Sequence, residues 1–275
     1  MTRTIPGIRI YQCPNCETLY RSIHNYIIVS YSNFGYQEIW SDGNVNRATT
    51  SCGFAECNIC GYFFNCHKRC IGTVEGSNKP KKGNFIPEIK QSIQNDLIAN
   101  GETLDKLSEL SLKRFSAFLQ SDGHDDYDEV NIRMCIWWQY NNLNLDLKTF
   151  QKKYKWDDEN EKLKTLEDIR LIENEIDEYK DLNLGNLKQL DYLVQDNKQD
   201  RYILRAEIKR HLSNFRDCRK MLLKISIKEY HLVKQFRRQI RKKDPYIFEI
   251  TDRLNTKCNP FEYYIEKMRK VLGIA

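Results

Sequence analysis

The chain has 275 residues, of which 40% are hydrophobic and 30% charged, and it contains twelve Phe and sixteen Tyr. This composition can bury a core, which excludes a globally disordered chain. No apolar run reaches the length of a membrane span, and residues 1–7 lack the apolar stretch of a secretory signal, so we expect a cytoplasmic protein. In a reducing compartment its ten cysteines are metal ligands or free thiols rather than disulfides.

The net charge of +6 is unevenly distributed along the chain. Residues 1–83 carry +4, residues 84–200 carry −10 and residues 201–275 carry +12. This asymmetry has three interpretations: contact between the middle and C-terminal segments, an acidic partner for the basic segment, or charged helix faces in solvent.

Four cysteines near the start of the chain form two CxxC pairs, Cys13/Cys16 and Cys57/Cys60, with forty residues between the pairs. Two such pairs complete the tetrahedral four-sulfur shell that is typical of structural zinc, so we predict one Zn²⁺ per chain. Iron would accept the same ligands. Free or redox-active thiols are the other alternative, although neither pair lies between a strand and a helix as in a thioredoxin-like βαβ unit.

Short strands are predicted around the cysteine pairs. Residues 8–11 lead into the first pair, and residues 26–31 and 36–40 are rich in β-branched and aromatic side chains. We predict a small β zinc ribbon over residues 1–72. A linker containing Gly, Ser, Lys and Pro is predicted over residues 73–83.

Further cysteines in this region make a second metal site an alternative hypothesis. Its candidate ligands are Cys52, Cys66, His67 (or His24) and Cys70. Two buried thiols on one face of a helix produce the same CxxxC spacing, so buried or idle thiols are the other interpretation.

From residue 84 the apolar spacing becomes helical, and we predict an α-helical domain over residues 84–275. A long helix is predicted to end at Asn183-Leu184-Gly185. Shorter helices are predicted at 186–196, 199–212, 215–224 and 226–243, with a last one beginning at Asn259-Pro260. The chain is therefore expected to be mostly α, with stacked helical hairpins after the ribbon.

One predicted hairpin, residues 199–225, resembles a single tetratricopeptide repeat. Small residues at Ala206 and Cys218 allow two helices to approach closely, and Phe215 fills the turn between them. Ser213-Asn214 replaces the glycine expected in that turn. No second clean copy is present, so we expect an irregular, tetratricopeptide-like domain rather than a regular array.

The chain as a whole resembles a group of uncharacterised bacterial proteins that join an N-terminal zinc ribbon to a tetratricopeptide-like helical domain. The matching features are the two CxxC pairs, the repeat-like hairpin, and the runs IWSDG at 39–43, FF at 63–64, IRMCIWW at 132–138 and DPY at 244–246. The resemblance implies an architecture and no reaction. Cys52, Cys66 and Cys70 are additional to the cysteines of that group's ribbon.

Catalytic motifs are absent from the sequence. It has no phosphate-cradling loop, nucleophile elbow or HExxH, and none of the five histidines pairs with a nucleophile at a catalytic spacing. Cys135, Cys218 and Cys258 lie in helical patterns and are expected to be small core residues. An enzyme is therefore the less favoured class.

The densest basic run lies at residues 237–243, with Phe236 and Ile240 expected on its buried side. The residues that share the opposite helical face are Arg237, Arg238, Arg241 and Lys242. This face suits an acidic protein surface, nucleic-acid phosphates, or solvent alone, and basic residues also favour a helix C-terminus.

The predicted function is a non-enzymatic, zinc-binding adaptor or scaffold that contacts a protein partner. The alternative is a nucleic-acid-binding protein that uses the zinc ribbon and the basic C-terminal helices. The second alternative is an enzyme whose site is assembled from scattered residues.

Overall fold

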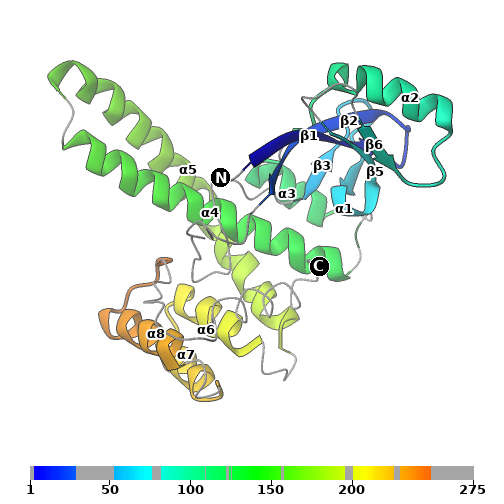
Figure 1. The fold of residues 1–275 in the computed structure, drawn as a ribbon. Helices are drawn as coiled ribbons and strands as arrows, with labels where there is room; N and C mark the ends of the chain where they lie inside the picture. Colours follow the sequence, from blue (N-terminus) through cyan, green and yellow to red (C-terminus); the bar gives the residue numbers. More distant parts are fainter. Residues whose placement is uncertain are drawn as a thin grey trace. The chain divides into compact units, whose positions relative to one another are not determined.

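The computed structural model describes residues 3–28, 53–75, 82–108, 110–121, 124, 126–155, 158–195, 201–225 and 230–248. The described residues form two compact units, one up to Asp128 and one from Glu129 onward. The chain is mostly α-helical with a small N-terminal sheet region, as the sequence predicts (Figure 1).

The first unit contains two antiparallel sheets. The strands are β1 (Arg3–Gln12), β2 (Leu19–Ile28), β3 (Phe54–Glu56), β4 (Phe63–Asn65), β5 (Cys70–Glu75) and β6 (Lys82–Phe85). Four of them form a sheet in the order β2-β1-β5-β6, and β3 pairs with β4 in a separate hairpin. The helices of this unit are α1 (Cys66–Arg69), α2 (Gln91–Asn100), the 3₁₀ turn η2 (Gly101–Thr103) and α3 (Leu112–Leu119).

Strand β1 separates two small clusters of buried side chains, because successive residues of a strand point to opposite faces. Ile8 and Ile10 pack with Val74 and with Leu97 of α2 in one cluster. Tyr11 belongs to the other cluster, which contains the buried cysteines of the two CxxC pairs. The cysteines therefore lie in a core of their own, on the far side of β1 from α2.

Helix α3 packs on the β3–β4 hairpin through aromatic rings. Phe118 meets the Phe54 ring edge-on, with centroids 5.6 Å apart, and stacks on the Phe63 ring at 4.9 Å. Arg114 forms a bidentate ion pair with Glu56, and its guanidinium lies 5.1 Å from the centre of the Phe63 ring. These contacts position the hairpin that carries the second CxxC pair.

The predicted linker over residues 73–83 differs from the structure. Residues 73–75 lie in β5 and residues 82–83 in β6, and the first unit continues to Asp128 instead of ending at residue 72. Gly72 and Gly83 lie against the Phe85 ring, where a Cβ would approach ring carbons to 2.2 Å and 2.4 Å. These glycines are therefore packing positions, whereas the sequence pattern suggested chain flexibility.

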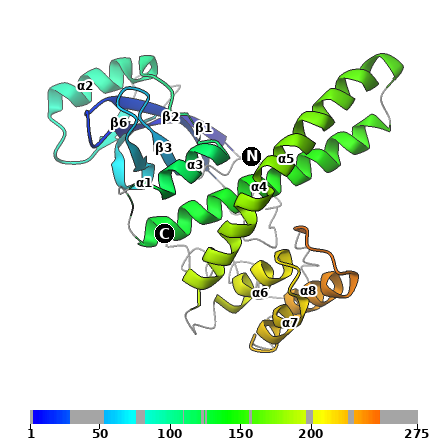
Figure 2. The ribbon, with the colours of Figure 1, turned by 180° about the vertical axis from the view of Figure 1, so that it is seen from behind.

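The second unit contains two long helices, α4 and α5, followed by three shorter helices that lie together (Figure 2). They are α4 (Asp126–Tyr154), which begins at the end of the first unit, α5 (Glu159–Leu193), α6 (Arg201–His211), α7 (Phe215–Leu222) and α8 (Tyr230–Lys242). Residues 134–138 of α4 are all buried, which marks this part of α4 as the centre of the unit. Cys135 and Cys218 are buried core residues, as predicted, and Cys258 lies outside the described residues.

The predicted end of the long helix at Asn183-Leu184-Gly185 is wrong, because α5 continues to Leu193. Glycine in a helix interior is unfavourable by about 1 kcal/mol relative to alanine, which tertiary contacts can outweigh. Asn186, one residue after Gly185, supplies such a contact: its side-chain N–H donates to the Arg133 carbonyl at 2.8 Å. That bond holds α5 against α4 just past the glycine.

Helices α6 and α7 form the hairpin predicted from the spacing of Ala206 and Cys218, both of which are fully buried. In the turn, Ser213 adopts a left-handed backbone with φ of 56°. Asn214 then caps α7, because its side-chain oxygen accepts from the Asp217 N–H at 3.2 Å. The turn therefore needs the glycine-like conformation that the repeat pattern implies, although it contains no glycine.

A buried polar network lies inside this hairpin, and no pattern in the sequence indicated it. Arg210 and Glu207 are fully buried and form a bidentate ion pair at 2.7 and 2.5 Å, and Arg210 also donates to the Asp244 carbonyl. His211 accepts from Trp137 Nε1–H at 3.4 Å through Nδ1, while its Nε2 lies 3.3 Å from Glu207. The network therefore joins α4, α6 and the segment after α8.

We predict that Ser213→Gly stabilises the protein, because a left-handed backbone is unfavourable by about 1–2 kcal/mol for a residue with a Cβ. Glycine also has more freedom in the unfolded chain, which leaves a net gain of about 0.5–1 kcal/mol. Ser213→Ala is the matched control, since it removes the hydroxyl and keeps the Cβ. Denaturant unfolding followed by circular dichroism measures both, and equal stability of the two variants would contradict the prediction.

Candidate metal centre

The two CxxC pairs lie in two loops of the same construction. Residues 13–18 connect β1 to β2, and residues 57–62 connect β3 to β4. In the first loop, the Cys13 N–H donates to the Thr18 carbonyl at 2.9 Å and the Glu17 N–H donates to the Cys13 carbonyl at 3.0 Å. The second loop has the equivalent bonds at 2.9 and 2.8 Å. The same two backbone hydrogen bonds therefore close each of the loops that carry the cysteine pairs.

The residue after each pair adopts a left-handed backbone, which lets the chain turn back toward the strand. This residue is Glu17 in the first loop, with φ of 59°, and Gly61 in the second, with φ of 71°. Glycine is suited to this conformation because it has no Cβ. The first loop adopts the same turn with a glutamate, at an energetic penalty.

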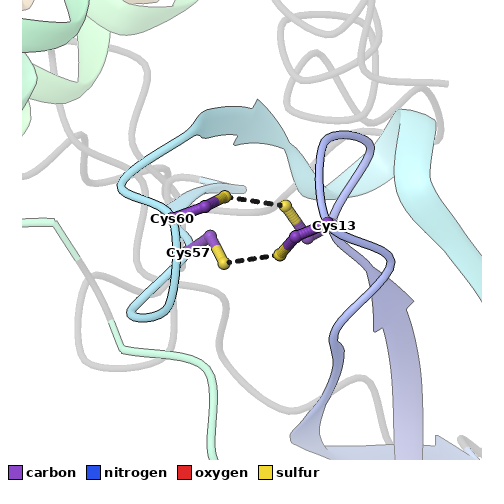
Figure 3. Close-up of side chains that lie close together, drawn as sticks. Cys13, Cys57 and Cys60 are labelled. Carbon is purple, nitrogen blue, oxygen red and sulfur yellow. Dashed lines mark hydrogen bonds between the residues drawn. The ribbon is translucent and has the colours of Figure 1, made fainter.

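The four sulfurs meet between the loops. Cys13 Sγ lies 3.7 Å from Cys60 Sγ (Figure 3). Cys16 Sγ lies 3.5 Å from Cys57 Sγ. All four ligand atoms lie within 4.8 Å of one another. Zn–S bonds of about 2.3 Å in a tetrahedral site place the sulfurs about 3.8 Å apart, so the cluster has the dimensions of such a site.

The cysteines of the cluster are free thiols, since a disulfide would place two sulfurs about 2.05 Å apart. Cys13 and Cys57, the first cysteine of each pair, are buried, whereas Cys60 is exposed. The geometry thus confirms the coarse prediction that these four residues form a group able to hold a metal.

Hydrogen bonds prepare Cys57 for ionisation. Its burial opposes the thiolate, but the Tyr20 hydroxyl and the backbone N–H groups of Cys60 and Ile59 outweigh burial and lower the pKa of Cys57 to about 6. The backbone N–H groups that stabilise this thiolate belong to the same loop as Cys57.

The first loop has one favoured and one disfavoured thiolate. The hydroxyl and N–H of Thr18 lower the pKa of Cys16, whereas burial raises the pKa of Cys13 to about 12. A metal ion binds thiolates, so it must displace the proton of Cys13. Binding consequently releases protons and weakens as the pH falls.

Tyr20 links the two loops, although no spacing in the sequence indicated it. It belongs to β2, which follows the first loop, and its side chain is only 2% exposed. Its hydroxyl contacts Cys57 Sγ at 3.0 Å and also the Asn58 side-chain oxygen in the second loop. An ionised Cys57 thiolate and the Asn58 amide oxygen can both only accept, so the single O–H proton of Tyr20 is shared between them. Burial raises the pKa of Tyr20, which keeps that proton in place.

The second candidate metal set is only partly described. Cys52 lies outside the described residues, as do the side chains of His24 and His67. Cys66 is buried with the first cluster, where burial raises the pKa of its thiol to about 12, and Cys70 packs against the same cluster. Among the described side chains, only Cys13, Cys16, Cys57 and Cys60 form a group with metal-site dimensions.

The predicted basic residues lie on α8. Arg237, Arg238, Arg241 and Lys242 are all exposed. Phe236 and Ile240 are buried on the opposite side of the helix, as their spacing predicts.

None of the helices in the described part of the chain is long and apolar enough to cross a membrane. No family model matches the chain, and no match was found among curated proteins or solved structures. The resemblance to proteins with a zinc ribbon and a tetratricopeptide-like domain therefore stays a prediction. Its coarse part is present here, since a small sheet region with a cysteine cluster precedes a helical region.

We predict that Tyr20→Phe weakens zinc binding by about tenfold, because groups that hydrogen-bond to a metal ligand support its charge and orientation. Tyr11→Phe is the matched control, since Tyr11 lies in the same buried cluster without a hydrogen bond to the four cysteines among those the structure describes. Competition with a chromophoric chelator measures both affinities. Equal affinities of the two variants would show that the Tyr20 hydroxyl does not support the site.

Proposed function

We propose that Cys13, Cys16, Cys57 and Cys60 hold one Zn²⁺ as a structural centre, and that the chain is a non-enzymatic protein-interaction module. The observation that carries the first part is the closed four-sulfur cluster. Four protein ligands fill a tetrahedral shell and leave no position for water or substrate, which is the arrangement of structural rather than catalytic zinc. Iron would accept the same four sulfurs, and elemental analysis distinguishes the two metals.

The small size of the surrounding core supports a structural role. The cluster around the cysteines has seven buried residues, and two of these, Cys13 and Cys57, are metal ligands themselves. A core this small contributes little stability alone, so metal binding would supply much of the free energy that holds the two hairpins together.

We predict one zinc per chain in freshly reduced protein and none in Cys60→Ser, measured by elemental analysis after gel filtration. Cys70→Ala is the matched control, because Cys70 packs against the same cluster outside the four-sulfur group, and it should retain one zinc. Two zincs in the wild type and one in Cys70→Ala would instead establish the second metal site. Full zinc in Cys60→Ser would contradict the assignment.

The surface of α5 supports the interaction role. Its exposed large apolar side chains are Leu163 (74% exposed), Leu171 (67%), Leu184 (41%) and Tyr192 (65%). At 100° per residue they fall within an arc of about 140° on one side of the helix. Exposed residues between 161 and 181 include seven acidic and three basic side chains. This face therefore suits a protein segment that carries apolar and basic side chains together.

We predict that Leu163→Asp with Leu171→Asp abolishes capture of a partner that wild-type protein retains. Lys164→Asp with Lys180→Asp is the control on the same helix, where exposed charges change and the apolar side chains stay. Quantitative mass spectrometry after affinity capture compares the three proteins, and sedimentation velocity tests self-association. A set of captured proteins that is identical for all three would remove α5 as the contact surface.

A further inference from the structure

The exposed sides of α7 and α8 carry a dense set of basic side chains that neither the zinc site nor the α5 surface uses. Ten described Lys and Arg residues between positions 216 and 243 are exposed. They are Arg216, Arg219, Lys220, Lys224, Lys234, Arg237, Arg238, Arg241, Lys242 and Lys243. The one acidic residue described in this stretch is Asp217, which pairs with Lys220 at 2.9 Å. We call this set the α7–α8 basic face.

The two helices bury their other sides in the same core. Cys218 of α7 is fully buried, and its thiol is close enough to Arg210 to interact with the charge of that guanidinium. On α8, Phe236 packs on Phe248 with ring centroids 5.3 Å apart, and the Arg210 guanidinium lies 5.2 Å from the centre of the Phe248 ring. The two helices lie side by side in both views (Figures 1 and 2). Their exposed sides therefore both point away from the Arg210 network.

The basic residues of α8 form a stripe along the helix. Lys234, Arg237, Arg238 and Arg241 fall within an arc of about 100° and span about 10 Å along the axis. Interaction with the helix dipole accounts for basic residues in the last turn, such as Arg241 and Lys242. It does not account for Lys234 and Arg237, which lie farther from the C-terminus.

The acidic residues of the described part of the unit do not neutralise this stripe. Asp191 of α5 pairs instead with α6, through Lys209 at 2.6 Å and Arg205 at 3.7 Å. Within the described residues, no arginine of α8 has an ion-pair partner. The contact between the acidic middle segment and the basic C-terminal segment thus exists at α6 and leaves the α8 charges available.

We propose that the α7–α8 basic face binds the phosphate backbone of a nucleic-acid duplex. Five of its ten side chains are arginines, whose planar guanidinium binds phosphate oxygens in pairs. A protein partner usually needs apolar anchors, and among the described residues from 215 to 243 the exposed large apolar side chain is Leu223, which directly follows α7. The 10 Å stripe matches about three base-pair steps of about 3.4 Å, so several phosphates are within reach at once.

The test uses the full zinc-loaded chain and fluorescence anisotropy with fluorescein-labelled 20-base-pair DNA and RNA duplexes of unrelated sequences, from 50 to 200 mM KCl. We expect the logarithm of the association constant to fall linearly with the logarithm of the salt concentration. The affinity should not depend on the duplex sequence. The triple variant Arg237→Gln, Arg238→Gln, Arg241→Gln should bind at least tenfold more weakly at 100 mM salt. Its salt slope should be smaller by about three, one for each lost phosphate contact.

The control is Lys152→Gln, Lys153→Gln, Lys164→Gln, which removes the same charge from exposed positions on α4 and α5 and should change affinity less than threefold. Arg216→Gln with Arg219→Gln on α7 is the second test variant, to be used if circular dichroism shows that the triple variant does not fold.

DNA and RNA binding of similar strength identifies the phosphate as the recognised group, and a preference for one duplex identifies the source. No binding at 50 mM salt, equal loss in the control, or tighter binding of labelled polyglutamate would overturn the proposal.

Discussion

Four sulfur atoms connect two β-hairpins that belong to different sheets. The loop after β1 and the loop after β3 have the same length and the same pair of backbone hydrogen bonds, so each presents its cysteines in the same way. A metal ion between them would convert two short hairpins into one unit. Tyr20 and the aromatic contacts of α3 support this junction from either side, by bridging the loops and by fixing the β3–β4 hairpin.

A buried ion pair organises the helical unit. Glu207 and Arg210 form this pair away from water, and burial disfavours the charged form of each side chain. Burial raises the pKa of Glu207, but Arg210 and its hydrogen bonds outweigh burial and hold that pKa below the usual range. The pair therefore contributes stability above the unfolded pKa of glutamate, and this contribution is lost as the pH falls through the folded value. Because the Asp244 carbonyl and Trp137 join the network, it also fixes how neighbouring segments meet the hairpin.

The two proposed contact surfaces differ in sign and in chemistry. The α5 side combines apolar and acidic side chains, whereas the α7–α8 basic face has little exposed apolar surface. A partner that suits one face would be repelled or left without anchors by the other, so the helical unit would sort its partners by charge. The metal, enclosed by four ligands, would hold the first unit in shape, with no chemistry of its own.

Local patterns in the sequence were sufficient for the cluster of four cysteines, for the mostly α fold and for the hairpin of Ala206 and Cys218. CxxC spacing brings two thiolates together within a single turn, and small residues at helical spacing mark close packing wherever the helices lie. The exposed charges of α8 followed from the same helical period. Features made by residues distant in the sequence needed the tertiary structure. Gly72 and Gly83 are packing positions because of the Phe85 ring, Gly185 lies in a helix held by the Asn186 contact, and Tyr20 reaches a cysteine 37 positions away. Buried contacts such as these depend on which surfaces meet in three dimensions, and no spacing along the chain encodes that.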